Sequence, residues 1–197
     1  MKPTDIHPGL QEERLVIIGQ LITAARHAAV SDHKPSEGDN NWVLGCRCYA
    51  WACHGVRRAT ERYPEWLTII EDGLHFVFGI GGVPLRFYRG EPDDVPERTM
   101  SVNLPELRAR QDAFSFAAQY RSKTHLRLAV ETDSLGEVST ITLIEVDEGL
   151  NPVGDGWVIP RETGKVVQFP TKEEGKDLGQ PPIVPKAKPE TEDGEKK

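Results

Sequence analysis

The fold is decided by residues 39–63, DNNWVLGCRCYAWACHGVRRATERY. Apolar residues recur there at steps of three, four and seven, which is the spacing of one helical face. That face comprises Trp42, Cys46, Tyr49, Cys53, Val56 and Tyr63. A second apolar face carries Leu44, Cys48 and Trp51. The pattern therefore predicts one largely buried helix on which the other elements pack.

A second amphipathic pattern precedes this helix. Residues 10–30 have helical apolar spacing, whereas residues 1–9 contain two prolines and a glycine and are expected to be extended. The turn formers of residues 31–39 separate the two helices, and Asp39 or Asn40 is a suitable N-cap. We therefore expect an antiparallel helical hairpin, packed closely through alanines and glycines.

After Pro64 the apolar period changes to two. Asp72-Gly73 and Gly81-Gly82 are two-residue hairpin signals, and they predict an antiparallel meander of strands 67–71, 74–80 and 83–89. Counting through both turns places one set of side chains towards the helices. This inward set is Leu67, Ile69, Leu74, Phe76, Phe78, Leu85 and Phe87. The opposite set, expected to face solvent, is Thr68, Ile70, His75, Val77, Arg86 and Tyr88.

The second half of the chain continues the pattern of helix and hairpin. A helix is predicted over residues 104–120, strands over 126–132 and 138–146, and a short strand near Trp157. Arg127 and Glu131 alternate with apolar residues, which indicates that this hairpin also has a solvated face. Strands grouped in hairpins favour an α+β fold, in which an antiparallel sheet of five or six strands packs on the helical hairpin and the third helix.

The composition divides the chain into two parts. Residues 1–169 are predicted to form a single α+β domain, and residues 170–197 a disordered, acidic and proline-rich tail that lacks the apolar residues needed to fold. The segment PPIVP within that tail is a candidate docking peptide, although such segments are more often linkers.

Charge and cysteine content narrow the classes of function. A net charge of −7 argues against bulk DNA binding and against anionic membranes, while RNA remains a candidate partner through a local basic patch. The three cysteines, without a signal peptide or an apolar span, favour the cytoplasm. The chain is expected to be of bacterial type.

No metal site or cofactor is predicted. Cys46 and Cys53 can converge on one helical face, but Cys48 and His54 point elsewhere, so a zinc site is rejected in favour of buried thiols. The segment GIGGVP lacks the lysine and the following helix of a phosphate loop, and it is interpreted as a hairpin turn.

The outward face of the meander is the best candidate site. The simplest interpretation is that this face is only the solvated side of the sheet. A binding surface built from Arg86, Tyr88 and Arg89 comes next, because Tyr and Arg are favoured at interfaces. Catalysis comes last, with His75, Tyr88 and Arg86 cleaving RNA by acid–base chemistry without a metal.

A second polar stripe runs along the helix of residues 39–63. It consists of Arg47, His54 and Arg58, and an exposed helix edge explains it better than an anion site does.

The sequence therefore predicts a cytosolic binding or regulatory accessory protein that acts through a protein partner, for example in a toxin–antitoxin or phage-defence module. The alternative is a small metal-independent ribonuclease or nucleotide hydrolase. Whether the protein is an enzyme is left open by its residues.

Overall fold

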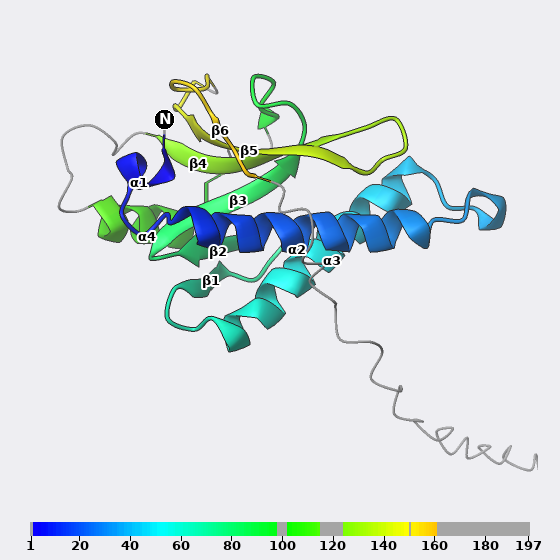
Figure 1. The fold of residues 1–197 in the computed structure, drawn as a ribbon, viewed down its shortest axis with the longest axis horizontal. Helices are drawn as coiled ribbons and strands as arrows, with labels where there is room; N and C mark the ends of the chain where they lie inside the picture. The colour runs from blue at the N-terminus through cyan, green and yellow to red at the C-terminus, as the bar shows by residue number, and fades with distance from the viewer. Residues whose placement is uncertain (1, 98–101, 115–123, 150, 161–197) are drawn as a thin grey trace, which may run out of the picture.

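The computed structural model describes residues 2–97, 102–114, 124–149 and 151–160 (Figure 1). Its helices are α1 (Pro3–Ile6), α2 (Glu12–Ser31), α3 (Asn41–Arg62) and α4 (Leu104–Phe114), with a 3-10 turn, η1, at Pro35–Glu37. Its strands are β1 (Leu67–Glu71), β2 (Val77–Ile80), β3 (Val83–Arg89), β4 (His125–Thr132), β5 (Val138–Val146) and β6 (Trp157–Val158).

The strands form one six-stranded sheet in the order of the sequence. Neighbouring strands are antiparallel except β3 and β4, which are parallel because the chain crosses over through α4 between them. The predicted α+β fold and the antiparallel meander of β1, β2 and β3 are confirmed. The parallel pair makes the sheet mixed, which the hairpin signals did not predict.

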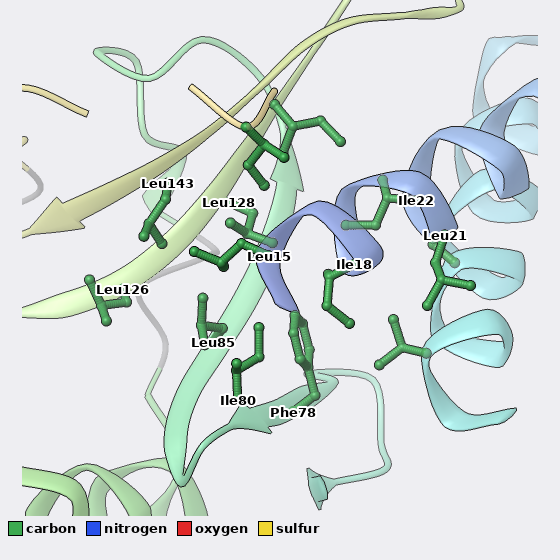
Figure 2. Packing of buried hydrophobic residues seen from close by; sticks show 14 of the residues in the cluster. Leu15, Ile18, Leu21, Ile22, Phe78, Ile80, Leu85, Leu126, Leu128 and Leu143 are labelled. Carbon is green, nitrogen blue, oxygen red and sulfur yellow. The ribbon is translucent and has the colours of Figure 1, made fainter. Parts of the chain in front are cut away.

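The helix α2 lies across one face of this sheet, with α3 beside it (Figure 1). Leu15, Ile18 and Ile22 of α2 belong to one core cluster with Leu85 and Leu128 of the sheet, and Leu15 lies next to Leu128 (Figure 2). Nine of the 20 residues of α2 are buried, compared with seven of the 22 residues of α3. The helix on which the core is built is therefore α2, and the prediction that α3 occupies this position is wrong.

The bounds of α3 follow the sequence closely. The side chain of Asn40 caps the helix by accepting hydrogen bonds of 3.0 Å from the backbone N–H groups of Trp42 and Val43. Cys53 and Val56 of the predicted apolar face are buried. Trp42 is 75% exposed and Cys46 is also exposed, so this face extends beyond the core at the start of the helix.

The two predicted turns of the meander have different outcomes. Gly81 and Gly82 form the expected two-residue turn, since Ile80 pairs with Val83 and both glycines have positive φ angles of 57° and 85°. The prediction of a two-residue turn at Asp72-Gly73 is wrong, because the register shifts after Ile69 and Glu71 pairs with Val77. Residues 72–76 form a loop instead, with Leu74 84% exposed rather than inward.

Contacts with α3 explain the longer loop. The Tyr49 hydroxyl donates to the Leu74 carbonyl at 3.0 Å and accepts from the Phe76 N–H at 3.2 Å. Arg57 Nε donates to both carboxylate oxygens of Asp72 at 3.1 Å. These tertiary contacts outweigh the local preference of Asp-Gly for a tight turn.

Several predicted segments fall outside the described residues. These are the last part of the predicted third helix, residues 115–120, and the tail, residues 170–197. Residues 3–6, expected to be extended, form the single turn α1. Among the described residues no helix has both the length and the hydropathy needed to cross a membrane.

Candidate functional site

The outward face of β3 is covered rather than solvated. Tyr88 is buried in a second apolar cluster with Val95, Ala129, Ile144 and Val146, and its hydroxyl donates to the Glu91 carbonyl at 2.8 Å. Burial raises the pKa of Tyr88 to about 12. The Tyr88 hydroxyl therefore lacks the exposure and the acidity that proton transfer to a substrate requires.

Arg86 lies on the same face and is also buried. Its Nη2 is 3.3 Å from Nδ1 of His75, a half-buried residue of the loop before β2, and its Nη1 is 3.6 Å from Oε2 of Glu106 on α4. The structure thus brings together His75 and Arg86 as predicted. The prediction that His75, Arg86 and Tyr88 form a solvated surface is wrong, because α4 and the loop around Val95 cover this face.

The centre of this region is an ion pair that sequence reasoning missed. Arg127 is directly beside Arg86 in the register of β4 and β3, and it is 0% exposed. Its Nη1 donates to Oε1 of Glu106 at 2.6 Å and to the Leu126 carbonyl at 2.9 Å. Glu106 is 1% exposed, so both charges are removed from water. Such charges persist in a folded protein only when they are paired.

A histidine and a third arginine complete the cluster. His125 is buried with its Nδ1 4.0 Å from Glu106 Oε1, and Arg110 Nη1 of α4 lies 3.2 Å from Nδ1 and 3.1 Å from Nε2 of His125. Burial, together with the positive charges of Arg127, Arg110 and Arg86, lowers the pKa of His125 to about 4. The imidazole is therefore neutral at pH 7 and accepts a hydrogen bond from Arg110.

A small cavity opens beside these groups. Its polar lining comes from Glu106, Arg110, Thr124, His125 and Glu145. The Thr124 hydroxyl donates to Glu145 within the lining. The cavity has room for about one water-sized group. We call Arg86, Glu106, Arg110, His125 and Arg127 the charged cluster.

The other predicted binding residues lie elsewhere. Arg89 is exposed at the end of β3. Arg47 of α3 is 3.4 Å from Asp32 and 3.3 Å from Asp39, so it braces the connection between α2 and α3. His54 and Arg58 are exposed on α3, as expected of a helix edge. Since α3 packs on the other side of the sheet, these residues do not join the charged cluster.

An exposed apolar surface is present where α3 begins. Trp42, Cys46 and Tyr49 lie on one side of the helix by their spacing, and Leu74 is held against Tyr49 by the hydrogen bond described above. Trp42 and Leu74 are 75% and 84% exposed. We call these four residues the Trp42 surface.

The three cysteines differ in their exposure to solvent. Cys46 is exposed, whereas Cys48 and Cys53 are buried. Burial raises the pKa of Cys53 to about 11 and that of Cys48 above its ordinary value. In the part of the chain that the structure describes, no three His, Cys, Asp or Glu side chains are arranged to hold a metal ion.

The missed residues gave weak signals in the sequence. Glu106 stands in the first turn of a predicted helix, where an acidic residue is ordinary, and Arg127 alternates with apolar residues as a solvated side chain would. Alternation of polar and apolar residues along β4 does not reveal that α4 covers the polar face of this strand.

Comparisons with models of protein families, with curated proteins and with solved structures found no match.

Proposed function

We propose that this protein works by binding a protein partner through the Trp42 surface. The observation that carries the proposal is the exposure of Trp42. Its side chain is 75% exposed at the first turn of a helical stripe in which Cys53 and Val56 are buried. Tryptophan is among the residues that most often dominate binding energy, because its large ring removes much apolar area from water.

The neighbourhood of Trp42 has the composition of an interface. Leu74 adds a second large apolar side chain, and burying one such side chain stabilises a complex by about 1.5–3 kcal/mol. The basic residues Arg47, His54 and Arg58 lie about 120–160° around α3 from Trp42, so they form a separate side of the helix. A partner that presents an apolar patch of its own fits the Trp42 surface.

A regulatory or accessory role agrees with this mode of action. In a two-component module, such as a toxin–antitoxin or phage-defence pair, the partner would be the second component. Recognition would then depend on the helix surface and require no reaction at the charged cluster.

The test is a pull-down with the tagged full chain, expressed in the organism that naturally carries its gene. Two variants of the Trp42 surface are compared with the unchanged chain. Trp42→Ala and Leu74→Ser are expected to lose a stoichiometric partner that the unchanged chain retains, with affinity at least about ten-fold weaker. Leu104→Ser is the matched control, because Leu104 is 68% exposed on α4, away from α3 (Figure 1). A partner held equally by all four proteins would refute the proposal.

The alternative hydrolase is addressed by a second assay. The burial of Arg86 and Tyr88 speaks against a reaction of RNA at this face, although His75 does contact Arg86. Purified, folded protein is expected to leave RNA intact in EDTA. Cleavage that disappears in His75→Ala, without loss of the fold, would favour the hydrolase instead.

A further inference from the structure

The charged cluster contains more positive than negative groups. Arg86 and Arg127 are neighbours in the sheet, and both point towards the single carboxylate of Glu106. Arg110 brings a third guanidinium group from α4. Two like charges on adjacent strands repel each other, so their burial requires an anion between them.

Glu106 meets that requirement incompletely. Its Oε1 is 2.6 Å from Arg127, a strong charge-assisted hydrogen bond, whereas its Oε2 is 3.6 Å from Arg86, beyond hydrogen-bonding distance. Among the described residues no group donates a hydrogen bond to this buried Oε2. Glu106 therefore makes its close ionic contact through one carboxylate oxygen, Oε1, while Oε2 lacks a hydrogen-bond donor among the described residues.

Arg110 has no carboxylate partner in the part of the chain that is described. Its Nη1 contacts the neutral His125 ring and the Thr124 carbonyl, at 3.3 Å. The carboxylate of Glu145 lines the same cavity, but it accepts from the Thr124 hydroxyl.

The attachment of α4 to the sheet depends on few buried groups. Only Glu106 and Phe114 of its 11 residues are buried. The adjacent cavity admits about one water-sized group, so a larger ligand can reach Arg86 and Arg127 only if Glu106 moves away. An anion that binds the arginines better than Glu106 does would displace the start of α4.

We propose that Arg86, Arg110 and Arg127 form a site for a phosphate-sized oxyanion, and that Glu106 occupies this site when the ligand is absent. A tetrahedral oxyanion presents more acceptor oxygens than a carboxylate and can accept from several guanidinium groups at once. Neutral His125 can donate one ring N–H to the anion without adding further repulsion. The site is distinct from the Trp42 surface and does not depend on it.

The experiment measures inorganic phosphate binding to the full chain by calorimetry, at constant ionic strength maintained with sodium chloride. Glu106→Gln removes the internal anion, so its phosphate affinity is expected to exceed that of the unchanged protein at least about ten-fold. Phosphate, but not chloride, is also expected to restore its thermal stability. Glu131→Gln is the control, a carboxylate of β4 outside the cluster, and should behave like the unchanged protein.

Two further variants keep the test decisive if Glu106→Gln does not fold alone. Glu106→Asp keeps the charge but shortens the side chain, and it should bind phosphate more tightly than the unchanged protein. Adding Arg110→Gln to Glu106→Asp should abolish that gain, because Arg110 supplies the third guanidinium group of the site, and circular dichroism would check that the double variant is folded. Equal phosphate affinity of Glu106→Asp and the unchanged protein would overturn the proposal, as would a gain that survives Arg110→Gln.

Discussion

At the scale of single residues, Arg127 shows how burial changes the meaning of a charged side chain. The backbone alternation of β4 places it opposite Leu126 and Leu128, where a solvated strand would carry a polar group. In the structure this position is buried, and Arg127 forms an ion pair there with Glu106 of α4. Removing one partner of such a pair typically costs about 3–5 kcal/mol, because an uncompensated charge stays inside.

The protonation of His125 makes stability depend on pH. Its pKa is about 4 in the folded protein, against 6.5 in an exposed histidine, so the unfolded chain binds this proton first as the pH falls. The stabilisation is therefore complete above pH 6.5 and is lost between pH 6.5 and 4, by up to about 3 kcal/mol. Urea unfolding at pH 7 and pH 5 should show this loss, and His125→Gln should reduce it. If the free energy of unfolding of His125→Gln falls by as much between pH 7 and pH 5 as that of the unchanged protein, the pH dependence belongs to other groups.

Thiol reactivity should distinguish the three cysteines. Cys46 is exposed, while burial raises the pKa of both Cys48 and Cys53, which removes their thiolate at neutral pH. We expect one thiol to react quickly with a maleimide in the native protein and all three to react in guanidinium. Mass spectrometry of Cys46→Ser is expected to show no fast labelling. Fast labelling of that variant would mean that a buried thiol is accessible.

At the scale of elements, the loop of residues 72–76 is defined by α3. Tyr49 satisfies two backbone groups of the loop, the Leu74 carbonyl and the Phe76 N–H. Its ring also packs on Phe87 of β3, at 5.2 Å between ring centroids. One side chain thus connects the helix, the loop and the sheet.

The contribution of Tyr49 can be measured by removing its hydroxyl. Tyr49→Phe keeps the ring but leaves both backbone groups of the loop without this partner, so we expect the free energy of unfolding to fall by about 1–3 kcal/mol. Denaturant titration gives the magnitude. Tyr63→Phe, which changes a tyrosine at the end of α3 that is not tied to this loop, is the control. Equal effects of the two changes would show that the hydroxyl contacts of Tyr49 are unimportant.

Two glycines provide a matched pair for the backbone. Gly82 has a φ of 85° and Gly45 is helical, and a Cβ at either position would meet no atom within 4 Å. Gly82→Ala should destabilise the protein by about 1–2 kcal/mol through strain in the turn. Gly45→Ala should stabilise it by about 0.5–1 kcal/mol through lower chain entropy. Thermal unfolding curves measure both shifts, and shifts of the same sign would contradict this account of the turn.

At the scale of the whole molecule, the described part of the chain, which ends at residue 160, contains a core and the charged cluster. The last buried side chain in the described chain is Ile159, which packs on Gly19 of α2. The sheet is thereby closed on α2 before the compositional change at residue 170.

A chain ending at Phe169 should consequently keep its stability. We expect its Tm to stay within about 2 °C of the full chain, since each kcal/mol shifts Tm by about 2–4 °C at this size. Calorimetry of both chains provides the comparison. A clear loss of stability would show that residues 170–197 contribute to the fold.

The order of helices and strands could be predicted because each signal is local. Period 3.6 before Pro64, period two after it, and the Gly81-Gly82 turn define elements within a few residues of their true bounds. The parallel pairing of β3 and β4 joins residues about 40 positions apart, such as Arg86 and Arg127, and no local pattern specifies it. The partners within the candidate site therefore stayed hidden.

The amino-acid sequence by itself determined the α+β class, the helical hairpin and the meander, since these depend on apolar periodicity and turn chemistry between near neighbours. Only the tertiary structure decided which helix lies under the sheet and which face of β3 meets water. Those outcomes depend on how separate elements compete for the same apolar surface. Arg86, Arg127 and Glu106 became a cluster for that reason, because the crossover through α4 brought a carboxylate over two arginines that the strands had already placed side by side.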